Sequence, residues 1–421
     1  MGKKRVLSLI LMLMIVICCV TEAFVIGELK KANDEMAHAI EDLNIEISDN
    51  SAAIEQVSAE VEKKAEEEIP VLYLPEDIYV CAGLTMEIYD DCVSSGVNLE
   101  DYDFYWECEV GDCMEEKYRI HADAEDVGEY TLTLHVYDLH LSEVASARTT
   151  LHVVPNVFSE EGTGSLSMLT IGDSMSASTD WLSYTRFLSG DKLSHLGTLG
   201  DTEGLMNEGR PGITALDYLE GTLYGEPADH PFINPQTKEF DWNYYKQSTG
   251  LEPDVVQVFL GTNGLEMDPV GNSGSIVEIV NRIREADPDI QIMVVQPIYP
   301  SYQDGMARQQ NIQGFEGLHG MWSLARSQMI FNLIGELEKE LADYDNVTIV
   351  PAAVMFDRDY GFDQSEIREN PHSEVLDSMP VQGVHPSAGG YDQIGDVIYS
   401  TLCWLIDEGK LETAHVEETG E

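Results

Sequence analysis

From residue 166 onward, short apolar runs alternate with amphipathic stretches. Strand candidates lie at 167–171, 195–199, 254–260, 290–296 and 347–350, and helical patterns at 212–221, 274–286, 318–343 and 387–407. Such alternation is typical of a parallel sheet covered by helices on both faces. In these sheets ligands bind beyond the carboxyl ends of the strands. The pattern predicts an α/β domain over residues 165–410, with its chemistry at those strand ends.

Residues 70–155 have a different pattern, in which apolar and polar positions alternate in short runs between turn-forming clusters. About seven short strands in about ninety residues fit a small β-sandwich. Trp106 lies in the middle of one strand candidate. The segment "DVGEYTLTLHVYD" is similar to the tyrosine-bearing strand of immunoglobulin-like domains, with Tyr130 at the corner position. We therefore predict an all-β, immunoglobulin-like domain without catalytic residues.

The first 23 residues read as an export signal. Residues 2–5 are basic, residues 6–20 are apolar apart from one serine, and a small-residue cleavage site follows at Ala23. A signal peptide and an uncleaved signal anchor both fit. Residues 24–69 are polar and acidic, which predicts a linker or stalk, and residues 411–421 form an acidic tail. We expect a secreted or cell-surface protein, attached to a membrane only through such an anchor.

Charge narrows the range of partners. The chain has 23 Lys and Arg against 77 Asp and Glu, a formal net charge of -54. A surface this acidic repels phosphate groups, which argues against nucleic acid and anionic lipid surfaces as partners.

The seven cysteines fall into three groups. Two belong to the signal, four cluster in the all-β region and one stands in the last helical pattern: Cys18 and Cys19; Cys81, Cys92, Cys108 and Cys113; and Cys403. In an exported protein the cluster is compatible with two disulfides of undetermined pairing. A zinc site is the alternative, although no C-x-x-C pair supports it. Cys403 is expected to be an inert core thiol.

Four segments at the predicted strand ends or beside them carry residues suited to acyl transfer. "LTIGDSMSAS" places Ser174 after an apolar strand, and "DVVQVFLGTNG" ends a strand at Asn263, whose amide can donate to an oxyanion. "NEGRPGITALDYL" is a loop opening a helix, with Gly212 as first and Gly209 as second oxyanion candidate. "VQGVHPSAGGY" puts His385 on a loop, where it can serve as a base. Taken singly, each residue also suits a turn, a cap or a structural role.

Together and in this order, the four segments resemble the SGNH (GDSL-like) serine hydrolases, from Leu166 to the end of the last helical pattern. The resemblance implies a flavodoxin-like three-layer α/β/α domain that needs no cofactor or metal. It also implies Ser174 as nucleophile, His385 as base, and an oxyanion hole formed by the Ser174 amide, the Gly212 amide and the Asn263 side chain. The stretch "PFINPQTKEFDWNYYKQSTGLEPDVV" is similar to an insertion of exported bacterial members.

One position departs from the family pattern. The family usually has Asp three residues before the histidine, where this chain has Gln382. A neutral side chain can orient the imidazole but cannot stabilise the imidazolium, and loss of that carboxylate costs about 10⁴ in rate in serine proteases. Three interpretations stay open: a Ser–His dyad helped by Gln382 or a carbonyl, a substitute carboxylate such as Asp377, or a weakened or inactive enzyme. Gly264, where the family often has Asp, is a lesser departure.

The expected activity is hydrolysis of esters, with O-acetyl groups on polysaccharide as the family-level candidate substrate and lipid or small-molecule esters as rivals. The alternative from another class is a non-catalytic surface module that binds glycan or protein, which Gln382 favours. An intact Ser174 and His385 favour the enzyme, and acyl transfer to a sugar is a third option.

Overall fold

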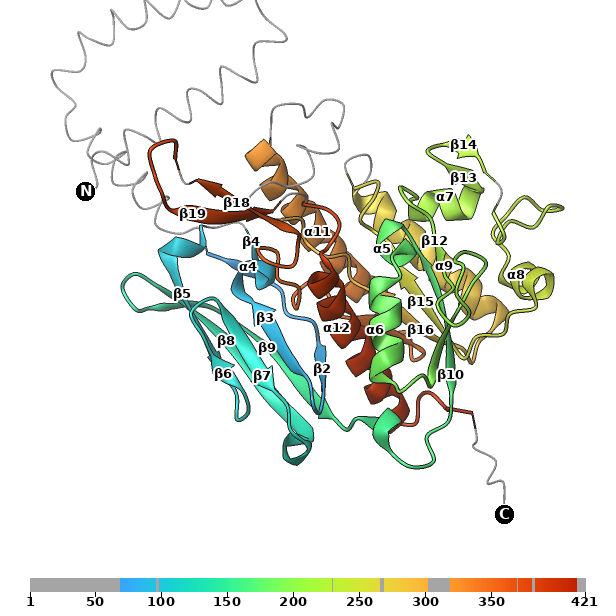
Figure 1. The fold of residues 1–421 in the computed structure, drawn as a ribbon, viewed down its shortest axis with the longest axis horizontal. Helices are drawn as coiled ribbons and strands as arrows, with labels where there is room; N and C mark the ends of the chain where they lie inside the picture. The colour runs from blue at the N-terminus through green and yellow to red at the C-terminus, as the bar shows by residue number, and fades with distance from the viewer. Residues whose placement is uncertain are drawn as a thin grey trace, which may run out of the picture. The chain divides into compact units, whose positions relative to one another are not determined.

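The computed structural model describes residues 69–95, 98–228, 230–265, 269–301, 319–368, 370–380 and 383–414 (Figure 1). Residues from Pro70 onward form one compact unit. The predicted export signal, almost all of the acidic stalk and most of the acidic tail lie outside the described residues, as does Gln382. Among the helices that are described, none is both long and apolar enough to cross a membrane.

The centre of the α/β region is a parallel sheet. Its strands are β10 (Leu166–Gly172), β11 (Leu193–Leu196), β15 (Val255–Phe259), β16 (Gln291–Val295) and β17 (Val347–Val350), with the short β12 (Glu208–Gly209) beside the end of β10. The spatial order β11-β10-β15-β16-β17 reads 2-1-3-4-5 along the chain, the order of flavodoxin-like doubly wound sheets. The predicted mixed α/β architecture with a parallel sheet is confirmed. The second strand begins and ends earlier than predicted, because Leu199 already pairs with Asn207 outside the sheet.

Helices cover both faces of this sheet (Figure 1). They are α5 (Ser174–Ala177), α6 (Asp180–Leu188), α7 (Ala215–Glu220), α8 (Trp242–Thr249), α9 (Pro269–Ala286), α11 (His319–Leu341) and α12 (Ala388–Asp407). Alternate residues of a strand face opposite sides. On β16, Met293 and Val295 pack into the core that contains α12, whereas Ile292 and Val294 pack into the core that contains α9 and α11. The sequence pattern missed α5, α6 and α8, which are short.

The all-β region consists of two small sheets that share one apolar core. One sheet has the order β2 (Asp77–Cys81), β9 (Glu143–Val154), β8 (Gly128–Asp138), β5 (Tyr102–Glu107), and the other β3 (Thr85–Tyr89), β7 (Lys117–His121), β6 (Asp112–Cys113). Trp106 is buried between them and donates to Asp90 at 2.7 Å. Tyr130 donates to the carbonyl of Asp126 at 2.8 Å, the bond expected of a corner tyrosine. The immunoglobulin-like assignment itself stays a prediction.

The remaining elements are short. They are β1 (Val71–Leu72), α4 (Asp90–Val93), β4 (Ser94–Ser95), β13 (Thr222–Leu223), β14 (Glu226–Pro227), β18 (Gln364–Arg368), β19 (Leu376–Pro380) and 3-10 turns at Leu99–Asp101, Ala124–Asp126 and Val157–Ser159.

Helix α12 joins the all-β region to the parallel sheet. The amide of Cys81 on β2 donates to Ser400 on α12 at 3.0 Å, and the rings of Tyr79 and Trp404 lie 4.5 Å apart. Residues of both regions therefore belong to one apolar cluster. Because α12 begins just after His385, this packing fixes the helix that follows the predicted base.

None of the five cysteines in the described part of the chain forms a disulfide. Cys81 and Cys92 are buried and Cys113 is exposed, so the two disulfides considered for the cluster are not observed. Burial raises the pKa of Cys403 well above its ordinary value. A thiol held in its neutral form is a poor nucleophile, as expected of an inert core cysteine.

Asp396 on α12 gives a stability prediction. Burial raises the pKa of Asp396 to about 7, although Tyr184 donates to its carboxyl at 3.0 Å. A pKa above the unfolded value means that stability is lost as pH rises between about 4 and 7. Asp396→Asn keeps the acceptor without the charge, so we expect it to stabilise the protein by about 2 kcal/mol at pH 8 and hardly at pH 4. Urea unfolding at the two pH values measures this, with the exposed Asp289→Asn as control; equal effects at both pH values would contradict it.

Candidate active site

Ser174 and His385 meet at the carboxyl end of the parallel sheet. Strand β10 ends at Gly172, and Asp173 then caps α5 by accepting from the Met175 amide at 2.9 Å, which leaves Ser174 as the first residue of that helix. His385 lies on the loop before α12. Its Nε2 is 3.0 Å from the Ser174 hydroxyl oxygen, and both side chains are half-buried. With Nε2 unprotonated, the serine donates this bond, which is the arrangement that a general base needs.

The other side of the imidazole is only partly described, because Gln382 lies outside the described residues. Asp377, the carboxylate considered as a substitute, lies on β19, is exposed and accepts from the Ser378 amide at 2.8 Å. Burial lowers the pKa of His385 below its ordinary value. A lowered pKa favours the neutral imidazole, the form that can accept a proton near pH 7.

Gly212 lies on the loop between β12 and α7. Its φ of 79° is in the left-handed region, and a Cβ there would collide with the ring of Tyr224, which covers this turn and donates to the Pro211 carbonyl at 3.2 Å. Within the described part of the chain, the backbone amides of Ser174 and Gly212 donate to no other group of the fold. Both amides are thus available to an oxyanion.

Gly209, the second oxyanion candidate, does not have a free amide. Its N–H donates to the Asn207 side chain at 2.8 Å, and its Cα packs against the backbone of α5 so closely that a Cβ would collide with Ala177. Glycine is required here for packing, and the prediction of an oxyanion role for Gly209 is corrected.

Asn263 follows β15 and connects three segments. Its Nδ2 donates to the Ile213 carbonyl at 3.1 Å and to Asp173 at 3.3 Å, and its own carbonyl accepts from Asn272 on α9 at 3.1 Å. The amide group therefore lies between the nucleophile and the Gly212 loop. Both of its hydrogens are engaged, so donation to an oxyanion would replace the longer bond, the one to Asp173.

A buried arginine beside the nucleophile was missed from sequence. Burial raises the pKa of Asp173 to about 7, while the Met175 amide and the charge of Arg326 act in the opposite direction. Arg326 is 1% exposed and lies on α11, for which the sequence pattern predicted a helix but no functional residue. An arginine inside an apolar helix pattern was the available signal, because such a charge is buried only when it is paired.

Two histidines that the sequence analysis left outside the predicted catalytic set are packed. His195 on β11 is buried against Thr185, 3.0 Å from its hydroxyl, and burial lowers its pKa to about 3. His230 is buried too, and its Nε2 is 3.2 Å from the Thr222 carbonyl. In the described residues, no group of three or more His, Cys, Asp and Glu side chains could hold a metal ion.

Comparison with known proteins gives structural likenesses only. No family model matches the chain, and no curated protein matches it significantly. Among solved structures, it is similar to a family 3 carbohydrate esterase from Talaromyces cellulolyticus (20% identity, TM-score 0.35, covering 58% of this chain and 99% of the other). A second is a family 3 carbohydrate esterase of Clostridium thermocellum (15% identity, TM-score 0.36, covering 57% of this chain and 98% of the other). A third is a lipase/acylhydrolase from Enterococcus faecalis (14% identity, TM-score 0.35, covering 60% of this chain and 100% of the other). At these identities and TM-scores the site is assigned from its own geometry.

Proposed function

We propose that this protein is a serine esterase with Ser174 as nucleophile and His385 as general base. The observation that carries the proposal is the 3.0 Å distance between His385 Nε2 and the Ser174 hydroxyl oxygen, across residues that are 211 positions apart in sequence. A serine next to an imidazole whose pKa is lowered by burial contains the nucleophile and the base that acyl transfer requires. In the described part of the chain the amides of Ser174 and Gly212 have no other acceptor, so they can serve as oxyanion donors.

The reaction has two steps. His385 takes the proton of Ser174 as its oxygen attacks the ester carbonyl, and the resulting oxyanion accepts hydrogen bonds from the amides of Ser174 and Gly212 and from Asn263. His385 then passes the proton to the leaving alcohol. Water, deprotonated by the same imidazole, attacks the acyl-enzyme and releases the acid and the free serine.

For the substrate we propose O-acetyl groups on carbohydrate. This part rests on the resemblance of the four sequence segments to SGNH hydrolases and on the export signal, which would bring the enzyme to extracellular polysaccharide. Secretion or surface attachment is part of the same proposal.

The experiment treats the purified full chain with a fluorophosphonate and maps the label by mass spectrometry, alongside acetate release from acetylated xylan and from a chromogenic acetyl ester. We expect one label, on Ser174, and acetate release that the label blocks. Turnover of the chromogenic ester alone would reject the carbohydrate substrate and keep the esterase. No label and no release from either substrate would favour the non-catalytic binding module.

The pH dependence of kcat/KM should be set by the protonation of His385. Because burial lowers its pKa, kcat/KM should fall tenfold per pH unit only below an acid-limb midpoint under about 6.5. Rates from pH 4.5 to 8.5 on the chromogenic ester measure that midpoint. Asp173→Asn is the control, since the pKa of Asp173 is about 7 and its removal should leave the limb in place. A midpoint above 7 in both proteins would contradict the assignment of His385 as base.

A further inference from the structure

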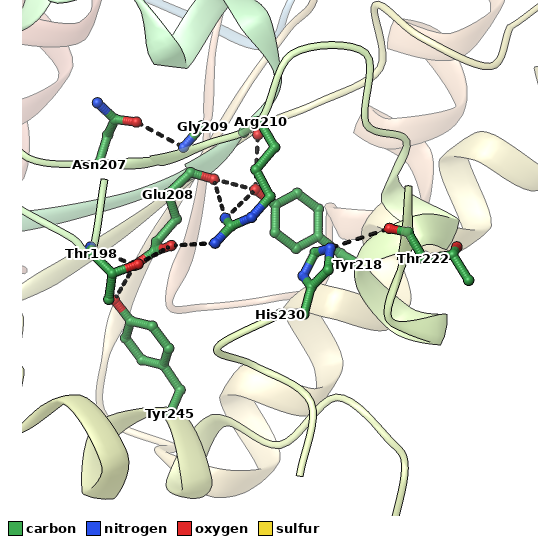
Figure 2. A network of polar contacts seen from close by, with 10 residues as sticks. Thr198, Asn207, Glu208, Gly209, Arg210, Tyr218, Thr222, His230 and Tyr245 are labelled. Atoms are coloured by element: carbon green, nitrogen blue, oxygen red, sulfur yellow. Dashed lines mark hydrogen bonds and ion pairs between the residues drawn. The ribbon is translucent and has the colours of Figure 1, made fainter. Parts of the chain in front are cut away.

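A buried carboxylate lies under the loop that carries Gly212. Glu208 on β12 is 0% exposed and accepts hydrogen bonds from the Thr198 amide (2.7 Å) and hydroxyl (3.0 Å), from Arg210 (3.0 Å) and from the Tyr245 hydroxyl (2.8 Å). Figure 2 shows this carboxylate between Arg210 and Tyr245. Burial of a carboxylate is costly unless its lone pairs are satisfied and its charge is paired. Both conditions are met, so this position is built for an acid.

The same network holds the end of the nucleophile strand. Arg210 donates from its backbone to the Gly172 carbonyl at 3.0 Å and from its guanidinium to the Glu208 carbonyl at 3.0 Å. The hydroxyl of Tyr218 on α7 donates to Gly172 at 2.9 Å and also contacts the Glu208 carbonyl. Gly172 is two residues before Ser174. The network therefore fixes the Gly212 loop relative to the nucleophile.

Helix α8 takes part through Tyr245, whose ring is stacked 4.2 Å from Phe232. His230 packs edge-on against Tyr218 at 5.0 Å between ring centres (Figure 2). Burial raises the pKa of Tyr245 above its ordinary value, so the phenol is neutral and donates to Glu208. The segment 230–250 thus contacts the residues that hold the Gly212 loop, through Tyr245 at Glu208 and through His230 at Tyr218.

We propose that Glu208 is a positioning residue that holds the Gly212 amide at the oxyanion site, and that Tyr245 links the 230–250 segment to this role. The proposal rests on the proposed esterase function. Arg210 joins the Glu208 carboxylate to the loop, because its guanidinium donates to that carboxylate while its amide donates to Gly172. A shift of Glu208 should therefore move the loop. Misplacement of a catalytic group by about 1 Å can cost about 10² in rate.

The test compares Glu208→Gln and Tyr245→Phe with the parent on the chromogenic acetyl ester. Gln keeps the shape but turns an N–H toward two of the four donors, so kcat should fall about a hundredfold with little change in KM. Tyr245→Phe removes one bond and keeps the ring, and we expect about a fivefold fall. Tyr244→Phe on the same helix is the matched control, since Tyr244 is half-buried and outside the network. Effects confined to KM, or equal effects of both Tyr variants, would overturn the proposal.

A double-variant cycle gives a readout that general destabilisation would not move. If Glu208 acts through Gly212, adding Glu208→Gln to Gly212→Ala should lower kcat by no more than about twofold further. Multiplication of the two effects would overturn the proposal. Should Glu208→Gln fail to fold, the same cycle with Tyr245→Phe decides.

Hydrogen exchange keeps the failure of this proposal distinct from failure of the proposed function. In the full chain, the hydrogen-bonded amides of this loop should exchange at least about tenfold faster in Tyr245→Phe and Glu208→Gln than in the parent, while those of β15 stay unchanged. These amides belong to Asn207, Gly209, Arg210 and Ile213. Unchanged exchange of the loop would overturn the positioning role. An inactive parent would reject the esterase, whereas the exchange result would still decide whether Glu208 fixes the loop.

Discussion

Ser174→Ala is expected to lower kcat on the chromogenic acetyl ester by about 10⁴-fold or more, with the protein still folded. The Ser174 hydroxyl oxygen lies 3.0 Å from Nε2 of His385, so the substitution removes the group that this imidazole would deprotonate. Without the hydroxyl no acyl-enzyme forms, and what remains is the smaller acceleration from the oxyanion donors acting on water.

Two further variants make this result specific. His385→Ala should cost about as much as Ser174→Ala, and the double variant should lose no more than either single one, because the pair acts as a unit. Ser178→Ala, at the end of the same short helix and outside the site, should leave kcat unchanged. Activity that survives Ser174→Ala would exclude Ser174 as nucleophile, and multiplicative losses would mean that Ser174 and His385 do not work together.

The strands of the parallel sheet could be predicted from the sequence because strands buried on both faces are continuous apolar runs. Strands β10, β15, β16 and β17 lie within a residue or two of their predicted positions. Strand ends also locate the site, since loops after β10 and β15 must meet at one edge of the sheet. The same rule predicts that Ser174 and Asn263 lie close together.

The supporting residues could not be found in the same way. The partners of Glu208 are Thr198, Arg210 and Tyr245. Thr198 and Tyr245 are ten or more positions away from Glu208, and Tyr245 lies on α8, a helix that the sequence pattern did not predict. Short helices such as α5 and α8 depend on tertiary contacts and caps more than on sequence periodicity. Gly209 was wrongly considered for the oxyanion hole for a related reason. In sequence, a glycine needed for close packing cannot be distinguished from one that offers its amide to a substrate.

The second large effect is expected for Gly212→Ala, which should lower kcat about 10²- to 10³-fold with little change in KM. Alanine disfavours the φ of 79° that Gly212 adopts, and its Cβ would collide with the Tyr224 ring. Both effects turn the amide away from the oxyanion position. Because that amide acts on charge that develops in the transition state, the loss should fall on kcat rather than on substrate binding.

The control is Gly250→Ala, which has a similar φ of 72° at the end of α8 but nothing within 4 Å of the added Cβ. It should cost about 1 kcal/mol of stability and leave kcat unchanged. Tyr224→Ala removes the colliding ring, so combining it with Gly212→Ala should restore part of the lost kcat. If the double variant recovers nothing and Gly250→Ala loses as much kcat as Gly212→Ala, backbone strain alone explains the loss and Gly212 has no role in binding the oxyanion.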